Sequence, residues 1–292
     1  KRFETVIAAF GASAAGCVFV PINPILKPEQ VRHILCDCKV RLLVTSPERL
    51  ESLSEILPSC ADLRHVSLAG SSQTCAPLEH IVLHPWLQAD SAEALPENIT
   101  ESELAAILYT SGSTGRPKGV MLSHRNLVAG AQSVAGYLGN RAEDRLLAAL
   151  PLSFDAGFSQ LTTAFSVGAQ VVLLNYLMPR DLIKAVEKWR VTGLTAVPPL
   201  WIPLANQLWP ESVREHLRYI ASTGGRMPGE TLARLRKALP EARVYLMYGL
   251  TEAFRATYLP PEEVDRRPDS IGKAIPNNEV LVLREDGRPC AP

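Results

Sequence analysis

The fold is decided by the stretch Tyr109-Thr110-Ser111-Gly112-Ser113-Thr114-Gly115-Arg116-Pro117-Lys118-Gly119, which follows the apolar run from Leu104 to Leu108. Its glycines allow positive φ angles and a close approach of the backbone to a ligand. Its hydroxyl groups can donate hydrogen bonds to phosphate oxygens, and consecutive backbone amides in such a turn form an anion nest. The stretch predicts a phosphate-binding loop whose binding residues are Thr110, Ser111, Gly112, Ser113, Thr114, Gly115 and Lys118.

Two other interpretations of this loop are weaker. An ordinary surface turn also gathers Ser, Thr and Gly, but here glycines alternate with hydroxyl residues and the run closes on a lysine after a proline. A Walker loop requires four residues between its glycines and a Ser or Thr after its lysine. Only two residues separate Gly112 from Gly115, and Gly119 follows Lys118, so the spacing excludes a Walker loop.

The segments on both sides of the loop predict an α/β fold. Ser123 is a preferred helix cap, and apolar residues at helical spacing follow it as far as Gly139, which can end the helix. Helices and strands alternate along the rest of the chain, which indicates a parallel sheet. Strands are expected over residues 40–44, 66–68, 146–150, 171–174, 194–197, 219–222 and 244–247, with a short buried one ending at Pro21; helices are expected over 5–15, 28–35, 48–57, 181–189 and 230–239, and a hairpin turn near 285–287.

The loop sequence YTSGSTGRPKG resembles the core signature of the adenylate-forming superfamily, which includes acyl-CoA synthetases, the adenylation domains of nonribosomal peptide synthetases, and luciferases. Further segments match in the order of the family, so the resemblance covers nearly the whole chain. The runs VPINPILKPEQVRHIL and LMYGLTEAFRATYLPPEEVDRRPDSIGKAIPN are similar to acyl-CoA ligases encoded with bacterial exosortase systems.

The resemblance implies a nucleotide site at two strand ends. Adenine would lie between the backbone of Gly224 and Gly225 and the ring of Tyr248, which Gly249 follows. Thr251 would meet the α-phosphate and Glu252 would bind Mg²⁺, so that Thr251, Glu252 and Lys118 are the catalytic residues. The chemistry agrees, because a flat ring needs bare backbone on one face and an aromatic on the other, and Mg²⁺ prefers carboxylate oxygens. In one departure from the family, Leu246 stands where Asn or Gln often lies, which removes a side-chain hydrogen bond to adenine.

An acid site is expected around Phe154-Asp155, after the strand over 146–150. Amino-acid-activating members of the family carry Phe-Asp there, and many acyl-CoA synthetases carry an aromatic-histidine pair. Asp155 can hold an α-ammonium group by a charge-assisted hydrogen bond, or it can cap the next helix. Arg255 is expected in solvent, since arginine is seldom buried unpaired, with a substrate carboxylate as its alternative partner. By resemblance, small residues leave room for a sizeable side chain in a pocket walled by Ala156, Ser159, Ala196, Ala221, Thr223, Met247 and Arg255.

The expected fold is the large N-terminal domain of an adenylate-forming enzyme: two α/β subdomains with stacked, mainly parallel sheets, plus the start of a small β-barrel. The first subdomain covers residues 1–100 and looks clipped at its beginning, the second covers 101–270 and holds the nucleotide and acid site, and residues 271–292 begin the β-subdomain. The ribose-binding Asp and the mobile C-terminal domain with its catalytic lysine are not found in this sequence. The chain is therefore expected to be a piece of a longer enzyme and to be inactive alone.

Composition excludes several classes of partner. Thirty basic residues balance thirty acidic ones without blocks of like charge, so we expect no nucleic-acid partner. The apolar runs are too short for a membrane span. The six cysteines are scattered without metal-site spacing, which favours reduced thiols in the cytoplasm.

The expected function is activation of a small carboxylic acid by ATP and Mg²⁺, with release of pyrophosphate. The acyl group then passes to coenzyme A or to the phosphopantetheine of an acyl or peptidyl carrier protein. Two alternatives stay open: an enzyme that adenylates an amino acid and loads a carrier, and a noncatalytic nucleotide-binding homologue.

Overall fold

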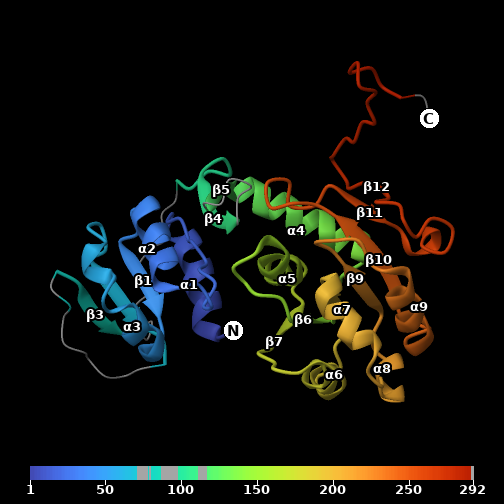
Figure 1. The fold of residues 1–292 in the computed structure, drawn as a ribbon, viewed down its shortest axis with the longest axis horizontal. Coiled ribbons are helices and arrows are strands. Elements are labelled where there is room, and N and C mark those ends of the chain that lie inside the picture. The colour runs from blue at the N-terminus through green and yellow to red at the C-terminus, as the bar shows by residue number, and fades with distance from the viewer. Residues whose placement is uncertain (71–77, 79, 87–97, 111–116, 291–292) are drawn as a thin grey trace. The chain divides into compact units, whose positions relative to one another are not determined.

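The computed structural model describes residues 1–70, 78, 80–86, 98–110 and 117–290 (Figure 1). The chain forms two compact units, Arg2–Ile99 and Thr100–Pro292, the second of which also includes Lys1. No helix in these described ranges is both long and apolar enough to cross a membrane.

The smaller unit is a three-stranded parallel sheet in the order β1-β2-β3, packed with helices. Its hydrophobic core joins residues of α2, α3 and the strands, among them Val31, Leu53 and Val66. The elements are α1 (Phe3–Ala14), α2 (Pro28–Asp37), β1 (Leu42–Thr45), α3 (Pro47–Leu53), the 3₁₀ helix η1 (Leu57–Ser59), β2 (His65–Leu68) and β3 (Val82–Pro85).

Most of the elements expected in this unit are confirmed, with two differences. The buried strand expected to end at Pro21 is wrong: Phe19 forms a single bridge and is buried, but Cys17 and Val18 are exposed. Among the described residues the strands of this sheet are β1, β2 and β3, so the segment before Pro21 is not one of them. Strand β3 was not expected.

The larger unit contains a seven-stranded sheet in the order β12-β11-β10-β9-β8-β6-β7 and a separate two-stranded hairpin, β4-β5. The five strands from β10 to β7 are parallel, and β11 and β12 are antiparallel to their neighbours. The elements are β4 (Leu104–Thr110), β5 (Lys118–Ser123), α4 (His124–Leu138), β6 (Arg145–Ala148), α5 (Asp155–Ser166), β7 (Gln170–Leu173), α6 (Pro179–Lys188), β8 (Gly193–Ala196), α7 (Pro198–Ala205), α8 (Glu211–Arg214), β9 (Tyr219–Ser222), α9 (Gly229–Ala238), β10 (Arg243–Tyr248), β11 (Thr257–Leu259), the 3₁₀ helix η2 (Pro261–Glu263) and β12 (Lys273–Ala274).

Helices cover both faces of the seven-stranded sheet (Figure 1). On one face, α4 and α5 pack on residues such as Tyr219, Tyr245 and Met247. On the other, α6, α7, α8 and α9 pack on alternate residues of the same strands, such as Ile220 and Val244. Burial on both faces explains why these strands are almost wholly apolar.

The predicted helix after the loop is confirmed as α4. Ser123 caps it: the Ser123 hydroxyl accepts from the Asn126 N–H at 3.2 Å, and the Asn126 side chain accepts from the Ser123 N–H at 3.0 Å. Gly139 ends the helix with φ 62°, the left-handed conformation of a helix C-cap. The hairpin partner β5, which lies between the loop and α4, was not expected.

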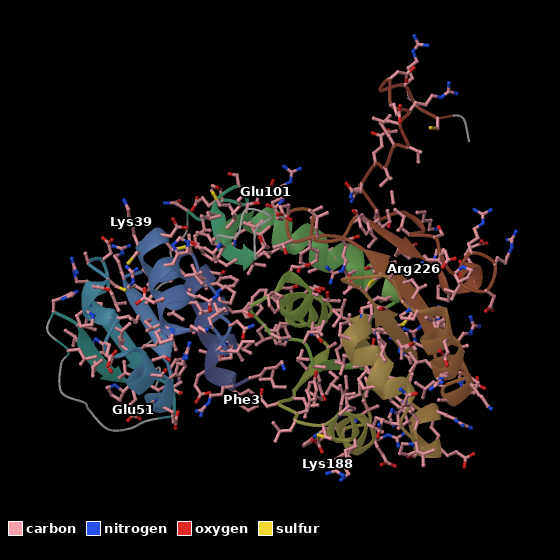
Figure 2. The ribbon with its side chains drawn as sticks, viewed as in Figure 1. Phe3, Lys39, Glu51, Glu101, Lys188 and Arg226 are labelled. Atoms are coloured by element: carbon pink, nitrogen blue, oxygen red, sulfur yellow. The ribbon has the colours of Figure 1, made fainter. Side chains whose placement is uncertain are left out.

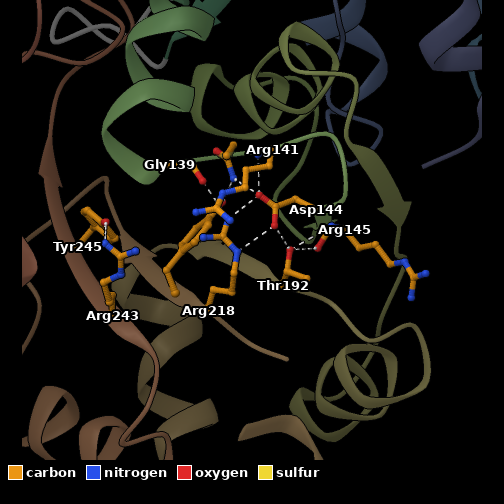
Figure 3. A network of polar contacts seen from close by, with 10 residues as sticks. Gly139, Arg141, Asp144, Arg145, Thr192, Arg218, Arg243 and Tyr245 are labelled. Carbon is orange, nitrogen blue, oxygen red and sulfur yellow. Dashed lines mark hydrogen bonds and ion pairs between the residues drawn. The ribbon is translucent and has the colours of Figure 1, made fainter. Parts of the chain in front are cut away.

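A buried polar network ties the amino ends of three parallel strands together (Figure 3). Asp144, just before β6, accepts hydrogen bonds from Arg218, just before β9, at 3.0 and 2.5 Å and from Thr192, just before β8, at 2.8 Å. The Arg141 N–H donates to it as well, at 2.9 Å. Burial alone would raise the pKa of Asp144, but these hydrogen bonds outweigh it and hold that pKa below its usual value.

Candidate active site

The candidate site lies at the carboxyl edge of the sheet, where β9 and β10 end side by side. These strands are parallel neighbours, with Ala221 beside Tyr245 and Ser222 beside Leu246. The two predicted motifs, which begin at Thr223 and Tyr248, therefore leave the sheet at the same edge, the place where ligands bind in α/β folds.

The two glycines after β9 leave the backbone bare. Gly224 has φ +77°, which favours glycine. A Cβ atom on Gly225 would contact only Pro198, at an ordinary 3.5 Å, so the described residues leave room beside this glycine. Tyr248, at the end of β10, is 46% exposed, so a ligand can reach it. The next residue along β9's loop, Arg226, lies at the surface (Figure 2) and pairs with Asp269 at 2.6 Å.

The loop after β10 folds back, which brings the hydroxyl of Thr251 to Asp155 of the acid motif. It closes where the Ala256 N–H donates to the Tyr248 carbonyl at 2.9 Å. Gly249 is required there, because a Cβ atom would lie 2.5 Å from the Phe254 carbonyl. Within this turn the Thr251 hydroxyl donates to Asp155 Oδ1 at 3.4 Å, which joins the ends of β10 and α5.

Asp155 forms a buried ion pair with Arg255. Arg255 Nη1 lies 2.9 Å from Asp155 Oδ2, and the two side chains are 1% and 16% exposed for Arg255 and Asp155. The expectation that Arg255 lies in solvent is therefore wrong, because the carboxylate that compensates its charge comes from a residue 100 positions earlier. The capping interpretation of Asp155 is wrong too: Phe154 occupies the cap position and Asp155 is the first residue of α5.

The guanidinium of Arg255 borders a small cavity between α4, α5 and the sheet. Its Nη1 also donates to the Phe254 carbonyl at 2.7 Å, and its Nη2 to the Ser159 hydroxyl at 3.5 Å. Its Nε has no partner among the described residues, and neither has the buried hydroxyl of Thr163. The cavity has a volume of about 10 Å³ and is lined by both of these residues, by Ser159 and by Met247.

Met247 is held in this wall by Tyr137 of α4, whose hydroxyl donates to the Met247 sulfur at 2.9 Å. Burial raises the pKa of Tyr137, with the positive charge of Arg255 acting in the opposite direction. The phenol therefore stays protonated and keeps its hydrogen bond at ordinary pH.

Only some of the residues predicted to bind phosphate or metal lie in the part of the chain that the structure describes. Thr110 ends β4 and the exposed Lys118 starts β5, and they pair across the hairpin. Ser111, Gly112, Ser113, Thr114 and Gly115 lie outside the described residues. Glu252 is exposed on its turn, and the described residues contain no cluster of three metal-ligating side chains. A single accessible carboxylate fits Mg²⁺, which commonly takes one or two carboxylates together with substrate phosphates.

Sequence reasoning placed Arg255 in the pocket wall but missed its burial and its ion pair with Asp155, and it did not single out Thr163. One signal in the sequence could have indicated this pair. Arg255 has the opposite charge to Asp155, and it closely follows the motif that begins at Tyr248, which was already assigned to the same site. Thr163 lies two helical turns beyond Asp155, so helical spacing places it on the same side of α5, but nothing in the sequence marks it as polar lining.

Several known proteins are similar to this chain along nearly its whole length. The profile of the family "AMP-binding enzyme" matches residues 1–292. Gramicidin S synthase 2 of Brevibacillus brevis is 27% identical over 98% of this chain and 6% of that protein. Indoleacetate–CoA ligase of Aromatoleum aromaticum is 29% identical over 99% of this chain and 56% of its own length.

Among solved structures, VinN is 28% identical with a TM-score of 0.78, over 99% of this chain and 69% of that one. The chain thus spans about half of the CoA ligase and a small part of the gramicidin S synthase. From the family match over its whole length and the architecture described above, we conclude that this chain belongs to the AMP-binding enzymes, the adenylate-forming family.

Proposed function

We propose that this chain supplies the nucleotide and acid site of an AMP-forming ligase that joins a carboxylic acid to a thiol. The hydrogen bond from Thr251 to Asp155 carries the proposal, because it joins the expected nucleotide motif to the expected acid motif at one sheet edge. The assignment of residues 101–270 to the subdomain that holds both sites is part of this proposal.

In the proposed complex, ATP lies along the carboxyl edge of the sheet. Adenine is sandwiched between the Gly224-Gly225 backbone and the Tyr248 ring, and Thr251 donates to the α-phosphate. Thr110 and Lys118 flank the loop that takes the β- and γ-phosphates. Mg²⁺ on Glu252 would offset the negative charge that builds up on the phosphates.

The reaction needs positioning more than covalent help from the protein. A carboxylate oxygen of the acid attacks the α-phosphorus, the bond to pyrophosphate breaks, and the acyl-adenylate remains. The contribution of Thr251 is to fix the α-phosphate beside the acid, and that of Lys118 is to lower the repulsion between anions. A thiol, of coenzyme A or of a carrier protein's phosphopantetheine, then displaces AMP. We expect this reaction in the cytoplasm.

A non-amino acid is the favoured substrate, because the carboxylate of Asp155 is already paired with Arg255. Adenylation of an amino acid is the second candidate. It is supported by the position of Asp155 at the mouth of the acid site and by the relative VinN, which was also solved in complex with L-aspartate and is 29% identical in that structure.

The test is ATP–pyrophosphate exchange by the full-length protein that contains this chain, with Mg²⁺ and a panel of plain carboxylic acids and amino acids. We expect exchange with plain acids, and its loss in Thr251→Val and Glu252→Gln. Glu262→Gln, a substitution of an exposed glutamate in η2, is the matched control and keeps full exchange. ATP binding without exchange for any acid would instead support the noncatalytic homologue.

A further inference from the structure

We propose that Arg255 is the specificity-determining residue of the acid site. Held in place by Asp155, it selects a short carboxylic acid whose chain carries a hydroxyl or carbonyl oxygen, and it rejects acids with a free ammonium group. This inference rests on the proposed function and names the substrate class of the same site.

The first step of the argument concerns unused hydrogen-bond donors. A guanidinium has five N–H donors. Two of those on Arg255 are directed at Asp155 and the Phe254 carbonyl through Nη1, and Nη2 makes a long contact with Ser159. The Nε–H is buried without a partner in the described structure, as is the Thr163 hydroxyl. Both residues line the same cavity. A buried polar group without a partner is costly, so an oxygen atom in this cavity that reaches these two groups would lower their free energy.

The second step concerns charge. Asp155 already compensates the positive charge of Arg255 at 2.9 Å. The free donors therefore need a neutral acceptor, because a second carboxylate would add an uncompensated negative charge in a buried place. An ammonium group at Asp155 would likewise have to share one carboxylate with the guanidinium, and two like charges would then meet away from water.

The third step concerns size. Small wall residues predicted room for a sizeable side chain, but Arg255 itself lies buried among them at 1% exposure. The cavity left beside it measures about 10 Å³, about the room that one water molecule needs. One oxygen atom of a substrate fits there, and a long alkyl chain does not.

The experiment compares four-carbon acids in ATP–pyrophosphate exchange with the full-length protein: butanoate, 3-hydroxybutanoate, 3-oxobutanoate and 2-aminobutanoate. For the wild-type protein we expect kcat/KM for the hydroxy and oxo acids to exceed that for butanoate by at least about tenfold. We expect no exchange with 2-aminobutanoate.

Variants separate the two roles of Arg255. Arg255→Lys keeps a positive charge beside Asp155 but loses the Nε–H. The ratio of kcat/KM for the hydroxy or oxo acid to kcat/KM for butanoate therefore falls toward one, while 2-aminobutanoate stays excluded. Arg255→Gln frees Asp155, and 2-aminobutanoate becomes a substrate. Thr163→Val lowers the oxygen preference, whereas Thr162→Val, whose hydroxyl donates to the Ser159 carbonyl at 3.3 Å, keeps it. Thermal melting of each variant verifies that it is folded.

Each of the following results would overturn the inference. Equal use of butanoate and 3-hydroxybutanoate by wild type and Arg255→Lys means that the cavity holds a structural water only. Exchange with 2-aminobutanoate by the wild-type protein removes the excluding role of Asp155 and Arg255. Exchange with large or long acids alone overturns the substrate class but leaves the proposed function standing, while silence with every acid, plain or amino, overturns both.

Discussion

At the residue scale, the two glycines after β9 differ in how much strain an added side chain would cause in the folded chain. Gly224 has φ +77° and its Cβ would lie 3.1 Å from Val197, so its replacement strains the fold itself. Gly225 has only an ordinary contact at 3.5 Å to Pro198. A methyl group at Gly225 therefore tests the ligand site without disturbing the chain.

We predict that Gly225→Ala weakens ATP binding by about tenfold, because the new methyl group would hold adenine away from the backbone, at a cost of about 1.4 kcal/mol. The melting temperature without ligand should stay unchanged. Calorimetric titration with ATP gives the affinity, and Gly229→Ala, with nothing within 4 Å of its Cβ, is the control. An unchanged affinity for Gly225→Ala would place adenine elsewhere.

Residue chemistry also marks where sequence reasoning stops. The strand-end motifs could be found because each is a short run whose residue types suit one chemical task. The burial of Arg255 could not, because its partner Asp155 is 100 residues away and only the folded sheet edge brings the two together. The same holds for the cavity, whose walls come from α4, α5 and four strands.

At the scale of elements, α4 and the loop after β10 approach each other closely at Gly130. Gly130 of α4 faces the ring of Phe254: a Cβ atom on Gly130 would lie 2.4 Å from that ring. Phe254 has φ 58°, precedes Arg255, and its ring lies 5.3 Å from the Arg255 guanidinium. Helix α4 thus supports the residue that we place in the acid site.

We predict that Gly130→Ala destabilises the protein by about 1–3 kcal/mol through overpacking and that it alters acid selectivity by displacing Arg255. Gly136→Ala, on the same helix with nothing within 4 Å of its Cβ, should be neutral or stabilising by up to about 1 kcal/mol. Urea unfolding of the pair gives both values. Equal stability of the two variants would show that Phe254 moves aside without cost.

Element types were easier to predict than element boundaries or partners. Buried strands such as β9, and capped helices such as α4, carry their signal locally in apolar runs and cap residues. Strand β5 was missed because Lys118–Ser123 has no strict alternation and is defined by pairing with β4. The strand expected before Pro21 failed for the converse reason: an apolar run needs a neighbouring strand to become part of a sheet.

At the scale of the whole molecule, the larger unit has one ion pair at each edge of its large sheet, and in both pairs at least one side chain is buried. Asp155 and Arg255 lie at the carboxyl edge, where ligands bind. Asp144 and Arg218 lie at the amino edge, where they join the starts of β6 and β9. A pair at the amino edge cannot contact a ligand at the other edge, so we assign Asp144 and Arg218 to stability alone.

This assignment predicts the direction of the acid dependence of stability. The pKa of Asp144 is lower in the folded chain than in the unfolded one, so its ionised form favours folding. The stabilisation is complete above the unfolded pKa of about 4, and it is lost as the pH falls through the lower, folded-state value. At neutral pH we expect Asp144→Asn to cost about 2–3 kcal/mol, less than for a fully buried pair because Arg218 keeps some exposure.

Urea unfolding of wild type and Asp144→Asn between pH 7 and pH 3 measures this dependence. The difference in unfolding free energy should be largest at pH 7 and shrink below about pH 4, because the Asp144 carboxyl group of the unfolded wild-type chain then binds a proton while that of the folded chain is still ionised. Asp269→Asn is the matched control: its pair with Arg226 is 72% and 77% exposed for the two side chains, so its removal should change stability by less than about 1 kcal/mol at any pH. A difference for Asp144→Asn that stays constant down to pH 3 would mean that shape and hydrogen bonding, and not charge, give Asp144 its role at the amino edge.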